Sequence, residues 1–159
     1  MKESLNKKYM RLAITEARKN LLSLYGGPFG ACIVKGKRVI AIARNTVLRS
    51  DAIAHAEVNA ICEASKKLKT FDLTGCSIYS TTEPCPMCFS AIHWAKIDSI
   101  AYGTSIRDVK KRDFNELTVS NARLKSIGKS KVKILSGFLR DECMLLLREW
   151  DRLENKKVY

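Results

Sequence analysis

The chain has 159 residues, of which 46% are hydrophobic and 28% are charged, values that are ordinary for a soluble globular protein with a buried core. The opening sequence MKESLNKKYM has no apolar run, and no stretch approaches the roughly 18 apolar residues of a membrane span. These features argue against secretion and membrane insertion. We therefore expect a cytoplasmic protein whose six cysteines are reduced thiols or metal ligands rather than disulfides.

The net charge of +13 is high for this length and raises the question of a nucleic-acid partner. The 29 lysine and arginine residues are spread along the chain rather than gathered in one run. A solvated basic surface explains this spread most simply, and RNA binding is the alternative.

Apolar residues at helical spacing predict a first helix over residues 5–24, ended by the Gly-Gly-Pro sequence that follows. Two β-type runs come next, at 29–35 and 38–44, with a hairpin turn at 35–37. The later predicted elements are, in chain order, a helix at 55–69, a strand at 76–80, a helix at 87–96, a strand at 98–103, a short helix at 117–124, a strand at 132–137 and a helix at 139–153. Residues 104–116 are polar and stay unassigned. This order predicts a three-layer α/β/α fold with a five-stranded mixed sheet.

Two short motifs stand where a strand or loop passes into a helix. They are HAE at residues 55–57 and EPCPMC at 83–88. In open α/β sheets, ligands tend to bind at such ends. The Cys-x-x-Cys spacing places both sulfurs on one side of a first helical turn, and a helix N-terminus favours the thiolate that metals require.

His55 and Glu57 are two residues apart, about 200° around a helix, and would not share a site in mid-helix. At a first turn, both side chains could lean over the helix end. His55 would then bind a metal while Glu57 reaches a water on it. One histidine with Cys85 and Cys88 leaves the fourth tetrahedral position open, as in catalytic zinc sites.

Each part of this pattern has a simpler explanation when taken alone. A lone histidine near a helix start is usually structural, and a lone Cys-x-x-Cys is as often redox-active or incidental. The combination of both motifs favours catalytic zinc. The other four cysteines, at 32, 62, 76 and 143, are predicted to be small core residues.

H-x-E together with P-C-x-x-C is the signature of zinc nucleobase deaminases. The sequence resembles the cytidine-deaminase-like superfamily of zinc nucleobase and nucleoside deaminases over nearly its whole length. The resemblance implies one deaminase domain over residues 1–159, with one zinc ion on His55, Cys85 and Cys88. It also implies that Glu57 is a proton shuttle and not a ligand. The zinc-bound water would lose a proton to Glu57, and the resulting hydroxide would attack the amino-bearing ring carbon.

The segments GGPFGACIV, NTVLRSDAIAHAEVNAI, EPCPMCFSAIHWA and ENKKVY resemble the bacterial guanine deaminase branch. Matching positions imply that Asn45 hydrogen-bonds the purine and that Phe29 and Trp94 shape its pocket or stack on it. The backbone N–H of Ala56 would meet the substrate. A turn residue at 45 and core aromatics at 29 and 94 are the structural alternatives.

The same resemblance implies a second proton carrier, Glu116, with Asp113 as reserve. It further implies that the tail, about residues 154–159, caps the active site through Tyr159, either within one chain or by exchange across a homodimer. A helix-start carboxylate at 116 and a frayed tail are the structural alternatives.

The sequence departs from the guanine deaminase branch in two places, so more than one substrate has to be considered. The guanine branch usually has a glycine where this chain has Asp113, and GFLRDECMLLLREW is closer to tRNA adenosine deaminases. Against tRNA stand Phe29 and the loop TSIRDVKKRDF, which lacks the glycines of the tRNA enzymes. The sequence favours a small purine, with guanine converted to xanthine and ammonia. Wobble adenosine in tRNA is the first alternative, and cytosine or another amino-heterocycle is the second. A zinc module that only binds nucleic acid would not need Glu57.

Overall fold

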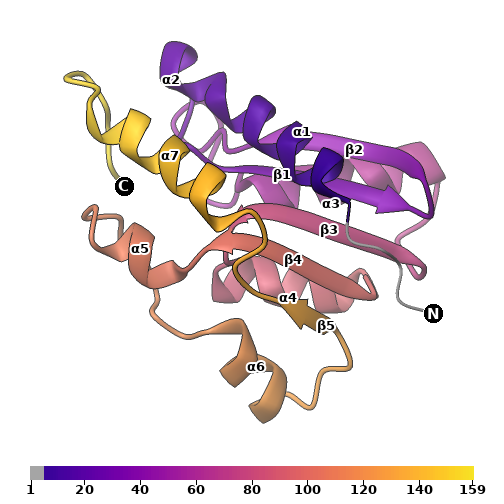
Figure 1. Cartoon of the computed structure of the whole chain (residues 1–159). Helices are drawn as coiled ribbons and strands as arrows, with labels where there is room; N and C mark the ends of the chain where they lie inside the picture. The colour runs from indigo at the N-terminus through magenta and orange to yellow at the C-terminus, as the bar shows by residue number, and fades with distance from the viewer. Residues whose placement is uncertain (1–5) are drawn as a thin grey trace.

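A five-stranded mixed sheet forms the centre of the computed structural model, which describes residues 6–159 (Figure 1). Its strand order is β2-β1-β3-β4-β5, and β1 is antiparallel to both neighbours while β3, β4 and β5 are parallel. The strands are β1 (Gly30–Lys35), β2 (Arg38–Arg44), β3 (Cys76–Thr82), β4 (Ser99–Thr104) and β5 (Lys133–Leu135). The predicted mixed sheet is confirmed.

Helices cover both faces of this sheet (Figure 1). Alternate residues of β1 explain the division, because Ala31 and Ile33 pack in one core with α3 and α4, whereas Cys32 and Val34 pack in another with α1 and α7. The helices are α1 (Lys7–Arg18), α2 (Asn20–Ser23), α3 (Ala56–Leu68), α4 (Pro86–Trp94), α5 (Ile106–Lys110), α6 (Asn121–Ile127) and α7 (Arg140–Asp151). The three-layer prediction is therefore confirmed.

The ends of four strands lie side by side along one edge of the sheet, the edge formed by strand ends and not by an outermost strand. β1 begins there, and β2, β3 and β4 end there, because β1 runs antiparallel to its two neighbours. Phe29 directly precedes β1, Asn45 follows β2, and the HAE and EPCPMC motifs follow β2 and β3. This edge is where an open α/β sheet would place a ligand.

The first predicted helix is shorter than expected. Residue 5 lies outside the described residues, α1 ends at Arg18, and α2 is a separate short turn. The break follows from Asn20, whose fully buried amide donates to the carbonyls of Gly27 and Asn45 at 2.8 and 2.7 Å. A long-range contact thus redirects the chain where periodicity alone continues the helix.

Two other predictions, one for a helix and one for a cysteine, were wrong. The helix expected at 117–124 begins instead at Asn121, after Ser120 caps it by accepting the Arg123 N–H at 3.3 Å. Leu117 is 69% exposed and lies outside it. Cys62 is exposed on α3 and is not a core residue, whereas Cys32, Cys76 and Cys143 are buried as expected.

The unassigned stretch contains α5, which a capping box fixes at its start. Ser105 and Asp108 exchange backbone and side-chain hydrogen bonds there. Across residues 6–159, no helix has both the length and the apolar character needed to cross a bilayer.

Candidate zinc centre

His55 and Cys85 occupy equivalent places, each as the residue that caps a helix N-terminus. His55 precedes α3 and Cys85 precedes α4, and both have extended backbone angles. His55 is therefore not helical, which lets its ring and the Glu57 carboxylate turn toward the same place. Pro86 occupies the first turn of α4, where its missing N–H has no helical partner to lose.

The three predicted ligands meet at this edge of the sheet. The Cys85 sulfur lies 3.6 Å from His55 Nδ1, and the ligand atoms of His55, Cys85 and Cys88 all lie within 4.8 Å of one another. Ligand atoms about 2.0–2.3 Å from a tetrahedral zinc are separated by about 3.5 Å. One imidazole and two thiols at this spacing fit zinc and leave a fourth coordination position.

The charge state of the cluster also suits a metal. Hydrogen bonds with Cys88 and His55 lower the pKa of the Cys85 thiol to about 4, in spite of its burial. Cys85 is thus a thiolate at neutral pH, the form that binds metals.

Glu57 lies buried beside these ligands, on the first turn of α3. Burial raises the pKa of its carboxyl, and the Cys85 thiolate adds to this effect. The Ser80 hydroxyl on β3 donates to Oε1 of Glu57 at 2.7 Å. A carboxylate with a raised pKa, held by one hydrogen bond at a metal cluster, can both accept and release a proton.

A small cavity adjoins the cluster and brings together several predicted site residues. It measures about 30 Å³, far below the roughly 300–1,000 Å³ of most small-molecule pockets. Its lining consists of Phe29, Asn45, His55, Glu57, Thr82, Glu83, Cys85, Glu116 and Tyr159. Burial and the nearby Cys85 thiolate raise the pKa of Glu116 to about 7, so two carboxyl groups with raised pKa values face this cavity.

The C-terminal residue closes the cavity from within the same chain. The Tyr159 hydroxyl accepts a hydrogen bond from the Gly27 N–H at 3.0 Å, and its carbonyl accepts one from the Asn115 N–H at 2.9 Å. Its ring packs edge-on against Phe114, which packs in turn against Phe29. The tail is therefore anchored by both backbone and side chain.

Comparison with known proteins agrees with this cluster. Residues 3–104 match the family described as the cytidine and deoxycytidylate deaminase zinc-binding region, a span that contains all three ligands and Glu57. The chain belongs to this deaminase family. It is a zinc-type nucleobase or nucleoside deaminase, a hydrolytic enzyme that acts on C–N bonds.

Curated relatives of this deaminase include enzymes named for two different substrates, guanine and tRNA adenosine. Guanine deaminase of Bacillus subtilis is 34% identical over 152 residues, covering 95% of this chain and 97% of that protein. A tRNA-specific adenosine deaminase of Buchnera aphidicola is 33% identical over 131 residues, covering 82% of each chain. A solved structure of guanine deaminase from Nitrosomonas europaea superposes with a TM-score of 0.85 at 28% identity, covering 94% and 86%.

Three predicted substrate residues of the deaminase, Ala56, Trp94 and Asp113, are not among the residues that line the cavity. Trp94 ends α4 and is 78% exposed, and Asp113 is exposed in the loop after α5. Asp113 has a φ of 67°, a left-handed backbone that glycine adopts freely and aspartate tolerates. This conformation explains how aspartate can stand where guanine deaminases usually have glycine. Ala56 is fully buried as the first residue of α3, beside His55.

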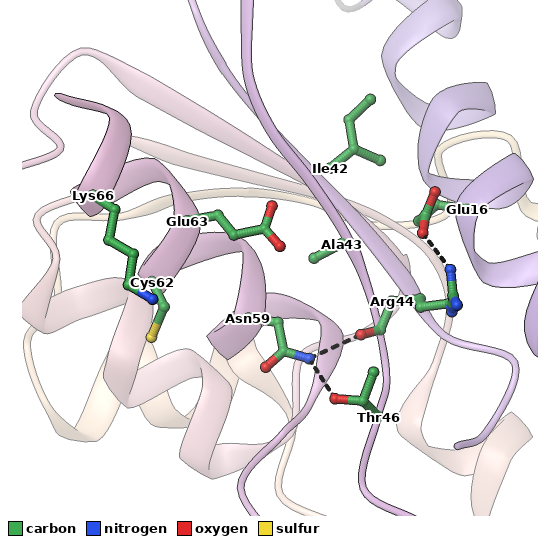
Figure 2. Close-up of a pocket in the computed structure, with 9 residues that line it drawn as sticks. All are labelled: Glu16, Ile42, Ala43, Arg44, Thr46, Asn59, Cys62, Glu63 and Lys66. Carbon is green, nitrogen blue, oxygen red and sulfur yellow. Dashed lines mark hydrogen bonds and ion pairs between the residues drawn. The ribbon is translucent and has the colours of Figure 1, made fainter. Parts of the chain in front are cut away.

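A larger pocket of about 350 Å³ lies away from the zinc cluster, along the outer edge of β2 between α1 and α3 (Figure 2). Its polar walls are largely paired with one another. Arg44 donates to Glu16 at 2.7 Å, and the Asn59 amide donates to the Arg44 carbonyl and the Thr46 hydroxyl at 2.9 and 3.1 Å. The Asn59 amide also reaches the Ala54 carbonyl, next to His55. The hydrogen bonds of Asn59 in this pocket therefore hold the loop that leads to His55.

Sequence patterns did not point to two supporting residues of the deaminase, Asn20 and Ser80. Asn20 holds the backbone of Asn45, and Ser80 holds Glu57. Ser80 lies in a strand that the sequence marked as buried, and a serine at a buried strand position is the signal that could have drawn attention to it. Asn20 had no comparable signal, because its partners are 7 and 25 residues away.

Proposed function

We propose that this deaminase acts on a small purine, and that guanine, converted to xanthine and ammonia, is its substrate. The observation that carries the proposal is the tail: Tyr159 closes the cavity over the zinc cluster and leaves about 30 Å³. A single planar base can take the place of the Tyr159 ring, while the main chain of the tail, which accepts the Asn115 N–H, still covers the site. A flipped nucleotide would also need room for its ribose and flanking residues.

Asn45 is the proposed purine-binding side chain. Its Oδ1 accepts the Val47 N–H at 3.1 Å, which orients the amide. The same side chain interacts with the Tyr159 hydroxyl in the closed cavity. We infer that a polar purine edge takes the position of this hydroxyl when substrate binds, with Phe29 and Phe114 against the ring.

Glu57 is the proposed proton carrier of the reaction. A zinc ion held by His55, Cys85 and Cys88 would supply a water with a pKa near neutrality. Glu57 would carry two protons in turn, both from the attacking water, the first to the ring nitrogen and the second to the departing amino group, which leaves as ammonia. Since Ser80 holds Oε1, we assign these transfers to Oε2. Glu116, which also lines the cavity, is proposed as the second carrier.

Deamination of wobble adenosine in tRNA is the second candidate. The tRNA-specific relative is about as similar as the guanine deaminase, and the net charge of +13 suits a nucleic acid. This function would require the tail to leave the cavity.

Ammonia release from a substrate panel tests the proposal. The panel contains guanine, guanosine, adenine, cytosine, cytidine and tRNA with a wobble adenosine. We expect guanine to give the highest kcat/KM. Turnover of tRNA alone would reject the proposal and establish the second candidate.

A further inference from the structure

Glu83 is a buried carboxylate that the deaminase motif does not explain. It follows β3 and stands two residues before Cys85, and it is 7% exposed. Its two oxygens have separate partners: Oε2 accepts the Ile106 N–H at 3.2 Å, and Oε1 accepts the Asn121 N–H at 2.8 Å. Ile106 and Asn121 are the first residues of α5 and α6. Within residues 6–159, no lysine, arginine or histidine forms an ion pair with Glu83.

The contact is reciprocal. The Asn121 amide donates back to the Pro84 carbonyl at 2.6 Å, and the Glu83 N–H donates to the Thr104 carbonyl at 2.7 Å. The residues directly ahead of Cys85 are thereby joined to both ends of the segment 106–121 and to Thr104, just before it.

This segment carries two groups of the cavity. Phe114 is buried, with its ring against Phe29 and Tyr159, and Glu116 lines the cavity itself. The chain between α5 and α6 has no helix or strand of its own to fix Glu116. The place of Glu116 relative to the zinc ligands therefore depends on the packing of Phe114 and on how the two ends of the segment are held.

We propose that Glu83 is a positioning residue, whose carboxylate fixes both ends of the segment 106–121 against the zinc-ligand loop and so sets the place of Glu116. This proposal rests on the proposed function in one respect, the role of Glu116 as second proton carrier. A carboxylate suits the task because it offers an acceptor oxygen to each of two backbone N–H donors. Glutamine offers one acceptor oxygen, and its NH₂ group would face the other N–H and leave it unpaired.

The variant Glu83→Gln tests the proposal when it is combined with Glu116→Gln in a double-mutant cycle. We expect the Glu83→Gln enzyme to hold one zinc ion per chain and to lose about 10- to 100-fold in kcat, the scale of a misplaced catalytic group. Because Glu83 acts through Glu116, the same change in the Glu116→Gln enzyme should lower kcat by less than about threefold. In the Glu83→Gln enzyme, amide hydrogen exchange should become faster in the segment 106–121 and stay unchanged in α3.

Asp108→Asn is the matched control. It makes the same carboxylate-to-amide change at the start of α5, but Asp108 contacts Ser105 and Arg140 and not the zinc-ligand loop. Its kcat should stay within about twofold of the wild type. Should Glu83→Gln fail to fold, Asn121→Ala keeps the backbone N–H and removes the bond to Pro84. It should show a smaller loss in kcat, again coupled to Glu116.

Three results would overturn the proposal: an unchanged kcat in Glu83→Gln, an equal loss with and without Glu116, or a loss that follows zinc content. If the Glu116→Gln enzyme keeps the wild-type kcat, Glu116 is not a second proton carrier. Amide hydrogen exchange in the segment 106–121 of the Glu83→Gln enzyme then tests by itself whether Glu83 fixes that segment. Faster exchange would support it, and unchanged protection would reject it.

Discussion

Glu57 is buried and accepts a hydrogen bond from the neutral Ser80 hydroxyl. Burial raises the pKa of its carboxyl, whereas the Ser80 hydroxyl favours the charged form and lowers it. The Ser80 bond also fixes the rotamer of Glu57 beside the three ligands. The proposed proton transfer by Glu57 is therefore expected to depend on a hydroxyl that has no part in the H-x-E signature.

Ser80→Ala should lower kcat about tenfold, because a hydrogen bond to a charged group contributes about 1.5–3 kcal/mol. Zinc content, measured by atomic absorption, should stay at one ion per chain. Ser77→Ala is the control: Ser77 lies in the same strand and bonds Ser99 at 2.7 Å, remote from the cluster. Equal kcat in the Ser80 and Ser77 variants would show that Ser80 does not support Glu57.

Among the described helices, five N-cap residues form two groups, while Lys19 and Leu139 precede α2 and α7 without a side-chain cap. Asn6, Ser105 and Ser120 cap α1, α5 and α6 with side-chain hydrogen bonds, as polar residues at this position usually do. His55 and Cys85 occupy the same position before α3 and α4 without any side-chain cap. At α3 and α4, the N-cap residue is a predicted metal ligand and adds no stabilising side-chain cap to the helix.

Asp108→Asn tests the capping of α5 through pH. The hydrogen bond and charge of Arg140, together with bonds from Ser105, hold the pKa of Asp108 below its ordinary value. The stabilisation is therefore complete above the unfolded pKa of about 3.9 and is lost as pH falls toward the lower folded value. Urea unfolding should show the variant about 1 kcal/mol less stable at pH 7, a value limited by the exposed Arg140. This difference should shrink at pH 3, and a difference equal at both pH values would contradict the assignment.

The tail is the element most closely tied to substrate choice. Deletion of residues 155–159 removes Tyr159 and its bond to Gly27. We expect lower kcat/KM on guanine, because the purine loses its cover, with no loss of zinc. If the tail also excludes polynucleotides, the truncated enzyme should bind tRNA more tightly than the full chain does. Unchanged kinetics on guanine would show that the tail plays no part in catalysis.

At the scale of the molecule, the predicted homodimer stays a prediction, and light scattering of the purified protein would test it. The tail reaches the cavity of its own chain here, so exchange between subunits is not required to fill that cavity.

What the sequence predicted depended on local spacing. His55, Cys85 and Cys88 were found because each motif occupies one helical turn, and the alternation in β1 reflects a sheet covered on both faces. The break at Asn20 and the partners of Glu83 involve residues 7 to 38 positions apart. Such contacts arise from packing, which periodicity does not encode. The start of α6 was missed because Leu117 continues an apolar pattern that the fold leaves exposed.

Ammonia release from guanine by the Glu57→Gln enzyme tests the central claim most directly, that the zinc cluster and the Glu57 carboxylate together drive the deamination. With zinc content measured in the same samples, we expect one ion per chain in both proteins and a kcat at least about 10²- to 10⁴-fold lower in the variant, the contribution of a general acid–base. A Glu57→Gln enzyme that retains zinc and wild-type turnover would contradict the account.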